Sequence, residues 1–189
     1  MTISNTHTIF AILDNSGIFP DDITAARARD LTIAWSRFKY FGPIIEDTSI
    51  AGILCQAVAS DADYCLIQAY GHILAEVWHS DDGESMEIMQ AISEWIAQRD
   101  FLVTGHVLEK EGSSYSLEPD CLLINLKLYR ELGCPVIDDA AGADLVRLSR
   151  ENGIEVYNFP VSIDASLVRL DPGCPGFWNS EPGPDDMPF

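Results

Sequence analysis

Basic residues are scarce in this sequence. Among its 189 residues, 11 are Lys or Arg and 30 are Asp or Glu, which gives a formal net charge of -19 at pH 7. A protein this acidic repels polyanions at long range, and no cluster of Lys or Arg is present to overcome that repulsion locally. We therefore expect no nucleic-acid partner and no binding to anionic membranes. A nucleotide ligand would need backbone N–H groups or a divalent cation to offset the charge.

Long apolar runs and an export signal are also missing. No uninterrupted apolar stretch approaches the ~20 residues that a membrane-spanning helix requires. The segment from Met1 to His7 has neither the basic patch nor the apolar stretch that is typical of a signal peptide. We expect a soluble protein with a cytoplasmic location.

The cysteines and histidines follow no metal-binding pattern. The five cysteines include no Cys-x-x-Cys pair, and their odd number argues against a disulfide framework as well as a structural zinc site. No His-Glu-x-x-His pattern occurs either, and the spacing of His72 and His79 is too wide for one metal on a helix. A metal-dependent hydrolase therefore stays a third hypothesis.

Strand-like and helix-like segments alternate along the chain. Apolar runs predict strands over 8–13, 64–69, 101–108, 121–126 and 154–159, and helical spacing predicts helices over 21–39, 50–60, 83–99, 127–132 and 144–151. A polar loop is expected over 109–119. This order predicts an α/β fold with a mainly parallel sheet, as a single three-layer domain over 1–170. Five prolines and three glycines predict an irregular tail over 171–189.

Two Gly-His pairs accompany predicted strands. Gly71-His72 follows the apolar run that starts at Tyr64, and Gly105-His106 follows the run that starts at Phe101. Open α/β sheets bind ligands where their strands end, and glycine there lets a ligand approach the backbone. If the two strands are parallel, with at most one strand between them, their ends lie within about 10 Å of each other. Each histidine is then either a base, phosphate contact or metal ligand in one crevice, or a hydrogen-bonding structural group.

Further polar residues stand beside predicted strands. Asp14 follows the first strand, where an acid either binds a base or ribose or simply forms a turn. Glu118 and Asp120 are expected on one side of an extended segment. They are either a catalytic base for a hydroxyl group or exposed loop acids. Asn125 is an amide inside an apolar run, where it needs hydrogen-bond partners from a ligand or from the fold.

The segment Ala62-Asp63-Tyr64-Cys65-Leu66-Ile67-Gln68-Ala69-Tyr70-Gly71, with this order of elements, resembles the nucleotide-sugar-binding half of GT-A-fold glycosyltransferases. The segments 104–108, 117–126 and 152–160 resemble parts of glycosyltransferase-like proteins, so the resemblance extends over about residues 47–165. It implies a GT-A, Rossmann-like sheet and transfer of a sugar from a nucleotide sugar to a hydroxyl acceptor. The residues expected to bind substrate are Asp14, Tyr70, Gly71, His72, Gly105 and Asn125, and the catalytic candidates are His106, Glu118 and Asp120.

The sequence departs from that family at the metal site. Residues 68–72, at the end of the predicted strand over 64–69, include no carboxylate where the family has its acidic metal motif. The Asp61-Ala62-Asp63 motif precedes this strand, so the motif is expected at the opposite edge of the sheet. A Mn²⁺ or Mg²⁺ ion would need His72 together with acids from elsewhere, such as Glu76, Glu118 or Asp120. The alternative is a non-catalytic binding or accessory protein on the same fold. The sugar, the acceptor and the oligomeric state stay open.

Overall fold

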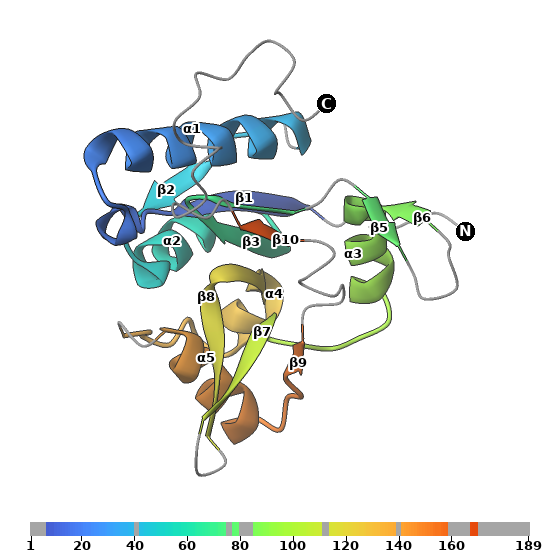
Figure 1. The fold of residues 1–189 in the computed structure, drawn as a ribbon. Helices are drawn as coiled ribbons and strands as arrows, with labels where there is room; N and C mark the ends of the chain where they lie inside the picture. Colours follow the sequence, from blue (N-terminus) through green and yellow to red (C-terminus); the bar gives the residue numbers. More distant parts are fainter. Residues whose placement is uncertain are drawn as a thin grey trace.

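A six-stranded sheet forms the centre of the computed structural model, which describes residues 7–39, 42–74, 77–79, 85–110, 114–138, 141–158 and 167–169. The strand order is β2-β1-β3-β8-β7-β9 (Figure 1). The strands are β1 (Thr8–Leu13), β2 (Ile45–Asp47), β3 (Tyr64–Ala69), β7 (Val103–Lys110), β8 (Ser114–Asn125) and β9 (Tyr157–Asn158).

Within this sheet, β8 is the antiparallel strand. β1 pairs in parallel with both β2 and β3, and β7 pairs in parallel with β9. β8 is antiparallel to its neighbours β3 and β7, so β3 and β7 point the same way. The predicted α/β fold with a mainly parallel sheet is confirmed. The ends of β1, β2 and β3 lie at one edge, which we call the C-terminal edge.

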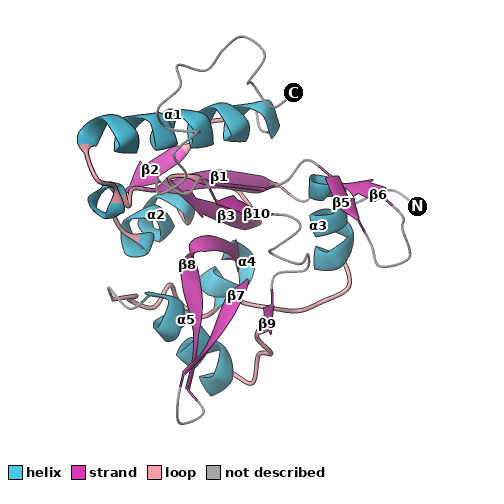
Figure 2. Ribbon diagram, in the orientation of Figure 1, coloured by secondary structure: helices cyan, strands magenta, loops and turns pink. Residues whose placement is uncertain are grey.

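Helices cover both faces of the sheet (Figure 2). They are α1 (Asp22–Lys39), α2 (Ile50–Ala57), α3 (Ile88–Ile96), α4 (Leu126–Glu131) and α5 (Ala141–Glu151), and a short 3-10 helix, η1 (Ser16–Ile18), precedes α1. α1 begins beyond the end of β1 and leads to β2, which is parallel to β1. It therefore runs back from beyond the C-terminal edge toward the start of β2. None of the described helices is long and apolar enough to cross a membrane.

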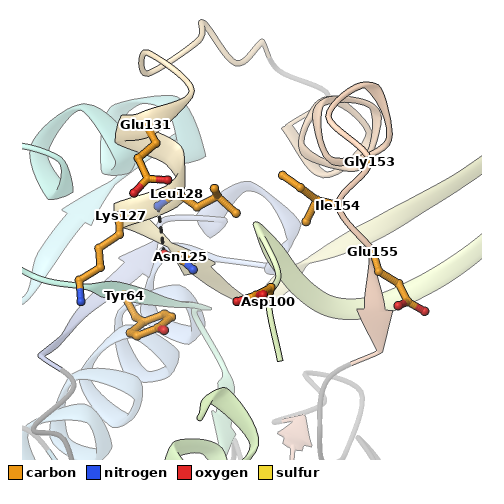
Figure 3. Close-up of a pocket in the computed structure, with 9 residues that line it drawn as sticks. All are labelled: Tyr64, Asp100, Asn125, Lys127, Leu128, Glu131, Gly153, Ile154 and Glu155. Carbon is orange, nitrogen blue, oxygen red and sulfur yellow. Dashed lines mark hydrogen bonds between the residues drawn. The ribbon is translucent and has the colours of Figure 1, made fainter. Parts of the chain in front are cut away.

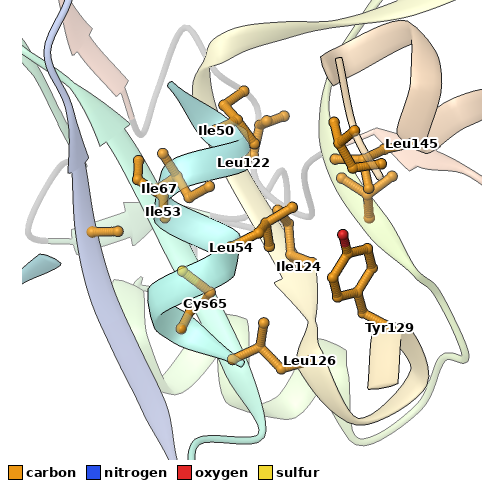
Figure 4. Packing of buried hydrophobic residues seen from close by; sticks show 14 of the residues in the cluster. Ile50, Ile53, Leu54, Cys65, Ile67, Leu122, Ile124, Leu126, Tyr129 and Leu145 are labelled. Atoms are coloured by element: carbon orange, nitrogen blue, oxygen red, sulfur yellow. The ribbon is translucent and has the colours of Figure 1, made fainter. Parts of the chain in front are cut away.

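The main hydrophobic core lies between the sheet and α2, α4 and α5 (Figure 4). Ile67 of β3, Leu122 of β8 and Ile53 of α2 are fully buried there. Alternate residues of β1 and β3, such as Phe10 and Leu66, belong to a second cluster on the other face. Burial on both faces explains why these strands are unbroken apolar runs in the sequence.

A hairpin occupies the segment predicted as a polar loop. The prediction of a loop over 109–119 is wrong, because Val107–Lys110 of β7 pair with Ser114–Leu117 of β8. The pairing then shifts, so that residues 118–121 of β8 lie opposite His106 alone. Pro119 stands in this bulge, where its missing N–H group costs no ladder hydrogen bond. The many polar residues of the hairpin concealed its strands from sequence reasoning.

Other boundaries differ from the predictions as well. The predicted helix over 83–99 divides into β6 (Ser85–Glu87) and the shorter α3, and β6 pairs with β5 (Val77–His79). A further short strand, β4 (His72–Leu74), follows β3 and pairs antiparallel with β10 (Leu167–Arg169). The predicted tail over 171–189 lies outside the described residues.

Candidate functional site

The residues that follow β1, β2 and β3 lie side by side at the C-terminal edge. The backbone N–H of Asp14 donates to the carbonyl of Asp47 over 2.8 Å, and the N–H of Tyr70 donates to the carbonyl of Leu13 over 3.2 Å. These bonds continue the parallel ladder by one residue beyond the strands. The structure thus brings two sequence candidates, Asp14 and Tyr70, to the same edge.

Tyr70 is hydrogen-bonded to an Arg29–Glu46 ion pair at this edge. Its hydroxyl donates to Oε1 of Glu46 over 2.5 Å, and Nε and Nη2 of Arg29 contact the two oxygens of the same carboxylate at 2.5 and 2.7 Å. The hydrogen bond from Arg29 lowers the pKa of Glu46, whereas burial first and the bond to Glu46 second raise the pKa of Tyr70. Tyr70 therefore stays protonated and uses its hydroxyl to fix α1, β2 and β3 together. Sequence reasoning missed Arg29 and Glu46.

Gly71 lies in the turn between β3 and β4. Its φ is 78°, in the left-handed region that glycine adopts without strain. Its N–H donates to the buried hydroxyl of Thr32 over 2.9 Å, and that hydroxyl donates to the carbonyl of Ala28 over 2.9 Å. The backbone turn alone explains the glycine, and it places His72 beside the end of β3.

His72 and Asp120 form a pair at this edge. The side chain of His72 is 5% exposed, and its Nε2 lies 3.4 Å from Oδ2 of Asp120 in the β8 bulge. The side chain of Gln68 donates from Nε2 to the backbone carbonyl of His72 over 3.3 Å. Two candidate residues from distant parts of the sequence are thus in contact. Glu118, on the other side of Pro119, is half-buried in the same bulge.

Buried amide groups near this edge lack hydrogen-bond partners within the described structure. Both Oδ1 and Nδ2 of Asn15, the residue after Asp14, are buried and unbonded there. Oε1 of Gln68 is also buried and unbonded there, and the residue is 1% exposed. Buried polar atoms in proteins almost always have a partner, so these three atoms are candidates for hydrogen bonds to a ligand or to water. Sequence reasoning missed both residues, although Gln68 is an amide in an apolar run.

The second Gly-His pair lies within a strand rather than at its end. β7 continues past His106 to Lys110, so the expectation of a strand end there is wrong. Gly105 pairs with Leu122, which pairs in turn with Ile67 of β3. One strand therefore separates β7 from β3, a spacing of about 10 Å. The backbone of His106 lies opposite the bulge that carries Asp120.

Packing explains Gly105 without a ligand. A Cβ atom on this residue would lie 2.7 Å from Cδ2 of Leu122 and 2.9 Å from the carbonyl oxygen of Cys121. The second contact is with backbone, which has little freedom to move. Glycine at this position lets β7 and β8 approach each other.

Asn125 lies at the opposite edge of the sheet, away from the other candidates. It pairs with Tyr64, the first residue of β3, and its Oδ1 accepts the N–H of Leu128 over 3.1 Å as the N-cap of α4. It borders a groove with a volume of about 620 Å³ (Figure 3). The groove is lined by Tyr64, Asp100, Asn125, Lys127, Leu128, Glu131, Gly153, Ile154 and Glu155. The structure therefore separates Asn125 from the site that the sequence grouped it with.

Asp63 also lies at that opposite edge, as expected from its place before the strand. Its carboxylate contacts Nζ of Lys127 at 2.9 Å and accepts the N–H of His7 over 3.1 Å. These contacts hold the start of β3 against α4 and the first described residues. The Asp61-Ala62-Asp63 motif is accordingly remote from Asp14 and His72.

The described residues do not assemble a metal site. Within them, no group of three or more His, Cys, Asp or Glu side chains is arranged to hold an ion. His72 and Asp120 supply only a pair of ligands, and Glu76 lies outside the described residues. We therefore assign no reaction step to Mn²⁺ or Mg²⁺.

No protein-family model matches this sequence, and no curated protein matches it significantly.

Proposed function

We propose that the protein binds a nucleotide sugar, or a related small molecule, at the C-terminal edge of its sheet. The observation that carries the proposal is the set of buried amide atoms of Asn15 and Gln68 that lack partners there. A ligand with both donors and acceptors, such as a nucleobase or a sugar, satisfies such atoms. The position agrees with the general location of ligands in open α/β sheets, beyond the carboxyl ends of the strands.

Asp14 is suited to bind the hydroxyl groups of a ribose. One of its carboxylate oxygens, Oδ1, accepts the N–H of Ser16 over 2.8 Å, which orients the group. A carboxylate held in this way accepts hydrogen bonds from vicinal hydroxyls. The half-buried side chain stays within reach of a ligand at the end of β1.

The His72–Asp120 pair is suited to general-base catalysis of sugar transfer. Asp120 is 22% exposed and His72 is 5% exposed, so the carboxylate is the member of the pair that an acceptor reaches. In the proposed step, Asp120 takes the proton of the acceptor hydroxyl while that oxygen forms a bond to the anomeric carbon. The bond from the anomeric carbon to the phosphate oxygen breaks, and its electron pair leaves with the nucleoside diphosphate. His72 orients the carboxylate.

Thermal denaturation and calorimetry test the binding proposal. Nucleotides and nucleotide sugars at millimolar concentration, with and without Mn²⁺ or Mg²⁺, should raise the Tm of the wild-type protein, because a ligand bound to the folded state stabilises it. Asn15→Ala should weaken binding about tenfold, since it removes hydrogen bonds to the ligand. Asn152→Ala, the same change at the exposed end of α5, should bind like wild type. Absence of any Tm rise in the wild type would contradict the proposal.

Release of nucleoside diphosphate separates the enzyme from the non-catalytic alternative. If the protein is a transferase, incubation with the nucleotide sugar that binds should release nucleoside diphosphate, and Asp120→Asn should lose this release while still binding. Binding with no release from the wild type, with water or simple sugars as acceptors, would favour a binding or accessory protein on the same fold.

A further inference from the structure

A diphosphate ligand brings negative charge to a protein whose formal net charge is already -19. In glycosyl transfer the charge on the leaving diphosphate grows as the bond breaks, and a cation beside it stabilises that charge. An arginine serves this purpose well, because its planar guanidinium donates two parallel hydrogen bonds to a phosphate group. The proposed site therefore calls for a basic side chain at the C-terminal edge.

Several basic side chains already have other partners. Arg29 and Tyr70 bind the same carboxylate, and both Nε and Nη2 of Arg29 are used in contacts with that group of Glu46. Lys127 contacts Asp63 at the opposite edge. Arg130 donates to the carbonyls of Val58, Ser60 and Ala62, and Arg147 contacts Asp144 and Glu151.

The short β4–β10 pair brings another arginine to the C-terminal edge. β10 is antiparallel to β4, and the register sets Arg169 opposite His72, Val168 opposite Ile73 and Leu167 opposite Leu74. The Cα atoms of directly opposed residues in such a pair lie about 4.5–5.5 Å apart, and the two residues share one face of the ladder. Arg169 is therefore placed beside the residue that contacts Asp120, although it is distant in sequence.

We propose that Arg169 binds the phosphate groups of the ligand and stabilises the nucleoside diphosphate as it leaves. This inference rests on the proposed function, and it adds the residue that recognises the charged part of the substrate. It also gives β10 a role, since its pairing with β4 sets Arg169 opposite His72. The recognition is of a diphosphate group in general and does not depend on the base or the sugar.

Calorimetry with uridine, UMP and UDP, and with the corresponding adenosine, guanosine and thymidine series, tests this role on the full chain. For the series that the wild type binds, affinity should rise from nucleoside to diphosphate. Arg169→Gln should lower the affinity for the diphosphate about tenfold and leave the affinity for the nucleoside unchanged. Arg37→Gln removes the same charge from an exposed position near the end of α1 and should change neither affinity by more than about twofold.

A second measurement uses the wild-type protein and does not depend on the variant folding. Phenylglyoxal modifies arginine side chains, and mass spectrometry maps the modified positions. The diphosphate should protect Arg169 and leave Arg37 unprotected, and the nucleoside should protect neither.

The outcomes separate the two proposals. Diphosphate affinity that is unchanged in Arg169→Gln, or equally lowered in Arg37→Gln, would overturn the role of Arg169 and leave the proposed function standing. Equal modification of Arg169 with and without diphosphate would overturn it as well. If the wild type binds no member of any series, the proposed function fails, and the role of Arg169 fails with it.

Discussion

Nε2 of His72 lies 3.4 Å from Oδ2 of Asp120, and two backbone irregularities produce this contact. The left-handed turn at Gly71 sets His72 beside the end of β3, and the β8 bulge around Pro119 displaces Asp120 from the regular ladder. Each irregularity coincides with a residue whose backbone is unusual, glycine in one case and proline in the other. The pair therefore depends on local chain geometry and not only on the sheet.

A double-mutant cycle should show that the contact between His72 and Asp120 contributes to the free energy of unfolding. His72→Gln and Asp120→Asn each remove one charged or ionisable partner, and each should destabilise the protein by about 1–3 kcal/mol because a buried group loses its partner. Urea unfolding of both single variants and of the double variant should give a coupling energy of at least about 0.5 kcal/mol. Strictly additive effects would mean that the two side chains do not interact in solution.

Acid should weaken the Arg29–Glu46–Tyr70 cluster. The pKa of Glu46 is lowered in the folded protein below its ordinary value of 4.5, chiefly by the hydrogen bond from Arg29. A folded pKa below the unfolded one stabilises the fold at pH values above the unfolded pKa, and this stability is lost as the pH falls through the folded pKa. Glu46→Gln should therefore cost about 1 kcal/mol at pH 7, allowing for the partial exposure of Arg29.

Chemical denaturation of wild type and Glu46→Gln between pH 7 and pH 3 tests this prediction. The difference in unfolding free energy between the two proteins should shrink as the pH falls below about 4.5. A difference that stays constant over this range would show that Glu46 is not held as a carboxylate in the folded protein.

Gly105→Ala should destabilise the sheet. The added Cβ would meet Leu122 and the backbone of Cys121, and overpacking of this kind costs about 1–3 kcal/mol. Gly17→Ala is the matched control, because a Cβ on Gly17 meets nothing within 4 Å. Thermal unfolding should show a clear loss of Tm in the first variant and little change in the second. Equal Tm values for the two variants would contradict the packing role of Gly105.

Asn125→Ala should reduce stability without affecting a ligand at the C-terminal edge. The substitution removes the N-cap of α4, which costs about 1 kcal/mol. Asn125→Asp keeps a side-chain oxygen for the N–H of Leu128 and should restore most of that loss. Urea unfolding measures the stability of both variants, and calorimetry measures binding. Loss of nucleotide affinity in Asn125→Asp would place the ligand at the groove of the opposite edge instead.

The sequence predicted the elements whose patterns are strong and local. β1 and β3 are unbroken apolar runs because both of their faces are buried, and α1 and α2 begin after polar residues that suit helix starts. The short strands β2, β4 and β10 escaped prediction because three residues carry too little pattern. The β7–β8 hairpin escaped it because Glu118-Pro119-Asp120 is typical of a loop, whereas the structure accommodates it as a bulge.

The candidate site was predictable only in part. The rule that ligands bind at strand ends selected Asp14, Tyr70 and His72, and the structure places all three at the C-terminal edge. Asn125 was singled out as an amide in an apolar run, and the antiparallel direction of β8 places it at the opposite edge. The contacts of Thr32, Arg29 and Glu46 depend on how α1 packs, which no short motif encodes.

Hydrogen exchange with mass spectrometry tests the central claim most directly, because it locates a ligand on the chain. The full chain is compared with and without the nucleotide sugar that raises its Tm most. The account predicts slower exchange at Asp14–Ser16 and Tyr70–His72, with no change at 125–131. Slower exchange confined to 125–131 and 153–155, or no change in exchange anywhere, would contradict a ligand site at the C-terminal edge.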